Sequence, residues 1–124
     1  MPNEHIPLED EEQALLFKWA EWASGQHPEL SLLYAIPNGG YRQKATAARM
    51  KKTGTKPGVP DVHLPVARHG CHGLYIEMKR RKGGNLSADQ KRWIEELIRQ
   101  GYRAVVCMGF DQARETLLAY LKED

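Results

Sequence analysis

The stretch GVPDVHLPVARHGCHGLYIEMK, residues 58–79, holds two apolar segments with the alternation of β-strands. The segments cover residues 59–66 and 73–80, and a polar turn around Arg68-His69-Gly70 joins them. Two short strands joined by a polar turn are most simply paired as an antiparallel hairpin. We therefore expect this stretch to form the centre of a β-sheet.

Charged residues lie at corresponding positions of the two predicted strands. Side chains alternate across a strand, so Glu77 and Lys79 share one face, and the hairpin can bring Asp61 beside Glu77. Two neighbouring carboxylates repel each other unless a cation lies between them, and Mg²⁺ or Mn²⁺ is suited to oxygen ligands. A metal there would activate water for phosphodiester hydrolysis, and Lys79 would stabilise the developing charge.

The rest of the chain predicts a mixed α/β fold. Periodicity and capping residues predict helices and strands outside the hairpin at the following positions: helices at 9–24 and 42–53, from Ser87 to Gly101 and after a possible N-cap at Asp111, and buried strands at 32–36 and 103–108. The strand, helix, strand unit over 73–108 should be parallel with a right-handed crossover. This order predicts a central sheet of about four strands with helices on both faces.

Two polar residues are predicted to face inward from helices. Glu12 precedes Leu15 and Leu16 by three and four positions, which is an unusual place for an unpaired acid. Gln90 has the same relation to the apolar residues that follow it, and it can also form a capping box with Ser87. Both are candidates for the carboxylate site, with Glu11 as the substitute if the first helix is rotated.

Composition places limits on the class of protein. A chain of 124 residues and 14.1 kDa fits one domain over residues 1–124, with 1–8 expected to be flexible. We expect an intracellular, cytoplasmic protein with no membrane partner, because no signal peptide or membrane-spanning segment is present. Cys71 and Cys107 are then expected to be reduced. The tryptophans are expected to pack in the core: Trp19, Trp22 and Trp93.

The net charge is only +2, but basic residues are concentrated in the middle of the chain. Residues 41–60 contain no acid, and a second basic group follows Lys79. Such a distribution favours contact with a polyanion, although a solvated face would have the same composition. The candidate DNA-binding residues are Asn38, Gly39, Arg42, Lys44, Arg49, Lys51, Lys52, Lys56, Arg80, Arg81 and Lys82.

Several ordered blocks together resemble one family. They are Glu12-Gln13, Ile36-Pro37-Asn38-Gly39-Gly40, Ala47-Ala48-Arg49-Met50-Lys51, Gly58-Val59-Pro60-Asp61, Tyr75-Ile76-Glu77-Met78-Lys79 and Leu86-Ser87-Ala88-Asp89-Gln90. The sequence resembles the VRR-NUC family, a branch of the PD-(D/E)XK nuclease superfamily, and in particular its small stand-alone members from phages and bacteria.

The resemblance implies a PD-(D/E)XK nuclease fold with an αβββαβ core and metal-dependent, structure-selective DNA cleavage. It implies Mg²⁺ or Mn²⁺ held by Asp61, Glu77 and Glu12, with Lys79 as the catalytic lysine and Gln90 as its companion. Stand-alone members resemble Holliday junction resolvases, which implies a homodimer acting on four-way junctions in a bacterial or phage-infected cell.

Other interpretations remain open at this point. The chain could be a non-catalytic DNA-binding protein on a nuclease fold, or a nuclease that cuts linear duplex or flap DNA. His69, Cys71 and His72 suggest zinc, but they lack a second ligand pair. His63 shares a strand face with Asp61 and is either near the metal or an ordinary strand residue.

Overall fold

Four strands form a mixed sheet in the computed structural model, which describes residues 5–37 and 44–123. The strands lie in the order β1-β2-β3-β4, with β1–β2 and β2–β3 antiparallel and β3–β4 parallel. This confirms the mixed sheet, the hairpin and the parallel unit. The strand bounds are β1 Tyr34–Ala35, β2 Val62–Leu64, β3 Leu74–Lys79 and β4 Arg103–Met108.

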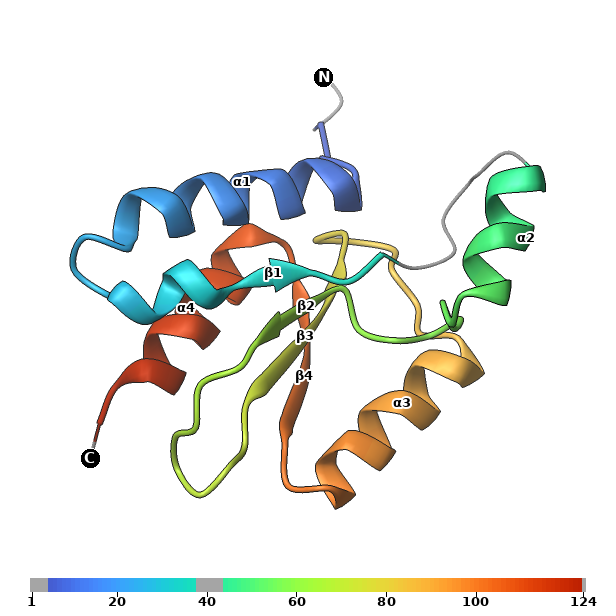
Figure 1. Cartoon of the computed structure of the whole chain (residues 1–124). Helices are drawn as coiled ribbons and strands as arrows, with labels where there is room; N and C mark the ends of the chain where they lie inside the picture. The colour runs from blue at the N-terminus through green and yellow to red at the C-terminus, as the bar shows by residue number, and fades with distance from the viewer. Residues whose placement is uncertain (1–4, 38–43, 124) are drawn as a thin grey trace.

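Helices cover both faces of the sheet, as Figure 1 shows. They are α1 Glu9–Ala23, α2 Lys44–Lys52, α3 Ala88–Arg99 and α4 Phe110–Leu121, with a short 3₁₀ helix, η1, at Pro28–Leu32. Ile76 and Met78 of β3 are buried in one core cluster with Leu16 of α1 and Leu117 of α4. Because alternate residues of β3 face the other way, Glu77 and Lys79 lie on the side of α3.

Three element boundaries differ from the predictions. The strand expected at 59–66 is shortened to Val62–Leu64. The strand expected at 32–36 is only two residues long, because Pro28 starts a 3₁₀ turn that buries Leu30 before the chain extends. The last helix is preceded by Gly109, with φ 91°, and not by Asp111, which lies in the first turn. The buried carboxylate of Glu12, from α1, supplies an acceptor at this helix start.

The prediction that all three tryptophans lie in the core is wrong for Trp22, which is 78% exposed. Trp19 is half-buried and meets Phe110 edge to face, with ring centroids 6.4 Å apart. The buried side of α1 runs through Leu16, Ala20 and Ala23, so Trp22 falls on another side of the helix.

The two cysteines are free thiols, as expected. Cys71 lies in the hairpin turn, which backbone hydrogen bonds between Arg68 and Cys71 close in both directions. Burial raises the pKa of the Cys107 thiol, which lies 3.4 Å from Thr116 Oγ1. Within the described residues, no helix is long and apolar enough to cross a membrane.

Candidate active site

The two strand carboxylates meet as the hairpin register predicts. Asp61 immediately precedes β2, and its Oδ2 accepts a hydrogen bond of 2.8 Å from Met78 N on β3. Glu77 hydrogen-bonds to Asp61 through its side chain. The pair therefore lies across the antiparallel ladder, next to the C-terminal end of β3.

Glu77 has a strongly perturbed carboxyl group. Its side chain is 1% exposed, and Oε2 is buried with no hydrogen-bond partner. Burial, followed by the hydrogen bond and the charge of Asp61, raises the pKa of Glu77 from 4.5 to about 9, although Lys79 acts in the opposite direction. A carboxyl group with its pKa raised in this way favours its protonated form in the metal-free protein.

Lys79 is held from the side by Gln90. Lys79 is 6% exposed, and its Nζ donates a hydrogen bond of 3.0 Å to Gln90 Oε1. The same oxygen accepts a bond of 2.9 Å from Ser87 N, while Gln90 N donates to Ser87 Oγ at 3.1 Å. Gln90 thus caps α3 and contacts Lys79 at once.

The close approach of the 58–61 segment to α3 explains the position of Asp61. Gly58 has φ 90°, and a Cβ there would lie 2.6 Å from atoms of Asp89 in the first turn of α3. Only glycine fits such a contact without a shift. The segment therefore passes over the start of α3, where Gln90 lies, before Pro60 and Asp61 lead into β2.

Two acidic residues of α1 make contacts at different places: Glu12 at the start of α4, and Glu9 at Lys79. Glu12 is 3% exposed, as its inward prediction requires, but its Oε1 accepts a bond of 3.3 Å from Phe110 N at the start of α4. Its Oε2 lies 3.2 Å from Arg81 Nε without forming a hydrogen bond. Glu9, one turn earlier, lies 3.9 Å from Lys79 Nζ.

Glu9 was not predicted to lie near the site. It precedes Glu12 by three positions and so shares its side of the helix, which is a signal that could have identified it. Its charge also contributes to the raised pKa of Glu77. Glu11, the substitute candidate, accepts a bond from Leu8 N and lies 3.9 Å from His5. The structure therefore gathers Asp61, Glu77, Lys79 and Gln90 and adds Glu9 beside the lysine.

This arrangement agrees with the comparisons with known proteins. The model of the VRR-NUC domain matches residues 9–111. The chain belongs to the VRR-NUC family. A solved structure described as "VRR_NUC domain protein" is similar at 30% identity and a TM-score of 0.80, over 96% of this chain and 93% of that chain. No curated protein matches.

Membership of the VRR-NUC family gives the chain a nuclease-type function, with DNA as the partner. The fold of this VRR-NUC chain is similar to the matched domain structure. The family match spans most of the predicted domain, whose boundaries at 1 and 124 stay a prediction.

The carboxylate pair of this VRR-NUC domain has the chemistry of a metal site. Glu77 Oε2 is an unpaired buried oxygen beside Asp61, and carboxylate oxygens suit Mg²⁺ or Mn²⁺. The described residues contain no group of three or more His, Cys, Asp or Glu able to hold a metal. Asp61 and Glu77 are the residues of this pair that would hold such a metal.

The predicted DNA-binding residues fall into three groups. Asn38, Gly39 and Arg42 lie outside the described residues, as does the side chain of Lys44 at the start of α2. Exposed positions on and after α2 carry Arg49, Lys51, Lys52 and Lys56. Figure 1 shows α2 at the periphery, near the start of α3.

The basic residues after β3 have contacts within the chain. Arg80 donates to the carbonyl oxygens of Ile6 and Pro7, at 2.9 and 3.3 Å. Arg81 pairs with Glu12, while Lys82 is exposed. Arg80 and Arg81 therefore attach the N-terminal segment and α1 to the end of β3.

His63 has the features of an ordinary strand residue. Its ring stacks on Tyr75 with centroids 4.1 Å apart, and Nδ1 lies 2.7 Å from Tyr34 Oη. Burial lowers its pKa. His69, from the suggested zinc group, instead has its Nε2 2.9 Å from the carbonyl oxygen of Tyr120.

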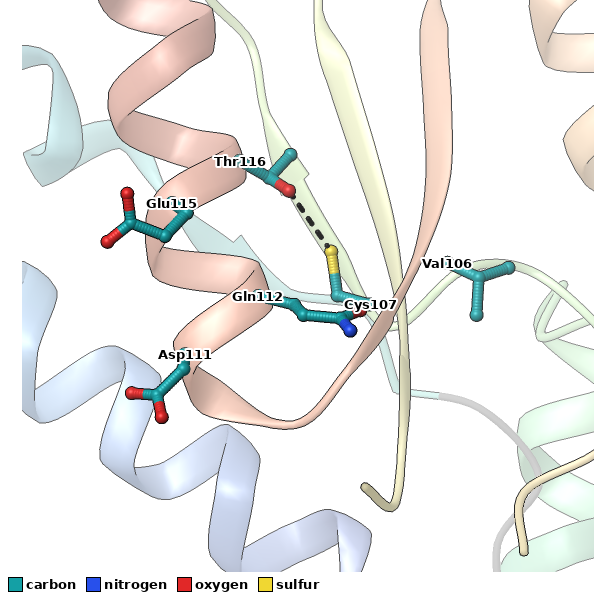
Figure 2. A pocket seen from close by; sticks show the side chains of 6 residues that line it. All are labelled: Val106, Cys107, Asp111, Gln112, Glu115 and Thr116. Carbon is teal, nitrogen blue, oxygen red and sulfur yellow. Dashed lines mark hydrogen bonds between the residues drawn. The ribbon is translucent and has the colours of Figure 1, made fainter. Parts of the chain in front are cut away.

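A separate hollow of about 410 Å³ lies between β4 and α4, as Figure 2 shows. Gln112 Oε1 accepts a hydrogen bond of 2.7 Å from Met108 N there, covering part of the edge strand. The hollow contains none of the predicted site residues. Its lining residues are Val106, Cys107, Asp111, Gln112, Glu115 and Thr116.

Proposed function

We propose that this chain is a divalent-metal-dependent endodeoxyribonuclease that cuts branched DNA, in particular four-way junctions, as a homodimer. The observation that carries the metal dependence is Glu77 Oε2, a buried carboxyl oxygen without a partner beside Asp61. An oxygen in this state is costly for the fold unless a ligand satisfies it.

Asp61 and Glu77 would hold the metal, which supplies Lewis acidity toward water and phosphate when bound. Asp61 is fixed by Met78 N, so one of its oxygens is already oriented. Lys79, positioned by Gln90, would donate to a non-bridging phosphate oxygen. These residues would bind and orient one phosphodiester.

Two α1 carboxylates receive different proposed roles. Glu9 lies beside Lys79 and would orient its ammonium group. Glu12 was expected to hold metal, and to reach one it would have to leave Phe110 N and Arg81. We assign Glu12 to anchoring α1 against the start of α4.

The proposed DNA contacts are phosphate contacts without base recognition. Arg49, Lys51 and Lys52 carry positive charge in the last turn of α2, and Lys56 continues the basic segment. Symmetric incision of a four-way junction needs two active sites, and one chain supplies one. A two-fold homodimer would supply both.

The experiment is cleavage of four-way junction, flap and linear duplex DNA with Mg²⁺, Mn²⁺ or chelator. We expect paired cuts in the junction, dependent on metal. Lys79→Ala and Asp61→Asn should abolish cutting and retain binding, which also excludes a contaminating nuclease.

Binding of junctions without cutting by wild-type protein in either metal would support the non-catalytic alternative. A preference for flap or linear duplex DNA would leave the metal chemistry in place and reject the junction assignment.

A further inference from the structure

One side of α1 presents a regular apolar stripe to solvent. Leu15 and Trp22 of α1 are 47% and 78% exposed, and Leu8, the N-cap residue just before the helix, is 57% exposed; the three are spaced seven positions apart. Residues seven apart lie on nearly the same side of a helix, two turns from one another. Figure 1 shows α1 on the outside of the molecule, across α4. The stripe therefore runs along the helix, away from its buried side.

A hollow of about 420 Å³ lies beside this stripe toward the N-terminal end of α1. Leu15, at the centre of the stripe, forms part of its wall, and Trp22 lies at the opposite end. Most of the residues that line the hollow precede Leu15 in the chain, whereas Trp22 follows it. The lining residues are His5, Pro7, Glu11, Ala14, Leu15 and Lys18.

A second copy of α1 in antiparallel orientation matches this arrangement. With the two-fold axis at Leu15, Trp22 and Leu8 lie about 10 Å from the axis in opposite directions, at about 1.5 Å per residue. Trp22 of one copy then lies opposite Leu8 of the other. Helical side chains lean toward the N-terminus, which directs Trp22 toward the partner's hollow. The same contact occurs twice.

The charges beside the stripe favour the same orientation. Glu11 lies four positions before Leu15, and Lys18 lies three positions after it. An antiparallel pair brings Glu11 of each copy beside Lys18 of the other, within about one residue of exact register. A parallel pair would instead place Glu11 beside Glu11 and Lys18 beside Lys18, which is unfavourable.

We propose that two copies of this chain associate through antiparallel α1 helices, with Trp22 of each copy inserted into the α1 hollow of the other. This inference rests on the homodimer in the proposed function and names its surface. Tryptophan in a pocket is a common energetic centre of protein interfaces. An isologous contact of this kind closes at two copies.

The first test is the mass of the protein in solution at about 100 μM without DNA, by light scattering or sedimentation. The wild type should have twice the monomer mass of 14.1 kDa. Trp22→Ala and Leu15→Glu should have the monomer mass, with unchanged circular dichroism because both side chains are exposed. Ile98→Ala, at an exposed apolar residue of α3, is the matched control and should remain dimeric.

The second test exchanges the charges. Lys18→Glu alone and Glu11→Lys alone should each weaken the dimer by creating like-charge pairs. Mixing these two variants should restore it, because the mixed dimer regains two opposite-charge pairs. Glu11→Lys also loses the hydrogen bond from Leu8 N. Because the same variant is measured alone and in the mixture, this loss cannot account for recovery of the dimer on mixing.

The outcomes separate the surface from the function. A wild-type dimer that persists in Trp22→Ala, or that dissociates in Ile98→Ala, rejects the α1 surface and leaves the nuclease proposal intact. A wild type that is monomeric at this concentration rejects both the surface and the homodimer. Trp22→Ala that is monomeric should still nick DNA, because Trp22 lies outside the catalytic group, but should lose paired incision of junctions.

Discussion

Metal-free protein should lose stability as pH rises, and Glu77→Gln should remove that loss. The pKa of Glu77 is raised to about 9, chiefly by burial and then by Asp61, so the folded state holds this proton more tightly than the unfolded state. The stabilising contribution is fully present below pH 4.5 and decreases as pH rises toward about 9. Glutamine resembles the protonated acid and has no proton to lose.

The size of the effect follows from linkage. One proton difference changes the free energy of unfolding by about 1.4 kcal/mol per pH unit, or about 3 kcal/mol between pH 6 and 8. The assay is urea unfolding in chelator at both values, for wild type and Glu77→Gln. The difference between the two proteins removes the pH-dependent contributions of the histidines and of other groups that both contain.

Bound metal should oppose this loss of stability with rising pH, because the cation needs the ionised carboxylate of Glu77 and must displace its proton. Calorimetric titration with Mg²⁺ at pH 7, in two buffers of different ionisation enthalpy, should show release of about one proton. Equal pH slopes for wild type and Glu77→Gln, together with no proton release, would refute the raised pKa of Glu77.

Other positions give independent predictions. Gly109→Ala should destabilise the fold by about 2 kcal/mol or more in urea unfolding, because φ is 91° and the new Cβ would lie 2.4 Å from Arg81 Cγ. Tyr120→Phe should cost about 1–2 kcal/mol in the same assay, since it removes a buried bond of 2.6 Å to Val66 O. Gln90→Ala should cost about 1 kcal/mol through loss of the capping box and should also lower the cleavage rate.

The strand part of the candidate site could be predicted because strand geometry is local. Alternation placed Glu77 and Lys79 on one face, and the polar turn fixed a register that brings Asp61 beside Glu77. The capping box of Gln90 was equally local, since it depends on Ser87 three positions earlier. These relations need no knowledge of how distant elements pack.

The contacts of α1 could be predicted only in part. Periodicity correctly predicted that Glu12 is buried, but its partners at Phe110 and Arg81 are set by the packing of α1 on α4 and on the end of β3. Glu9 has no apolar neighbour pattern of its own and reaches Lys79 only because the helix starts beside β3. Such contacts depend on tertiary distances that helical spacing does not specify.

Trp22 was wrongly predicted to lie in the core because α1 has apolar residues on two sides. Helical periodicity does not say which of the two sides packs against the core of the chain. Leu16 and Ala20 face the sheet, whereas Leu15 and Trp22 face outward. In the proposed dimer, the Leu16 side packs within the chain and the Leu15 side contacts the partner. The end of α1 that carries Glu9 beside Lys79 also lies next to the hollow for the partner's Trp22. Pairing through α1 would therefore fix the two catalytic centres at opposite ends of one rigid helix pair, which is what two coordinated cuts require.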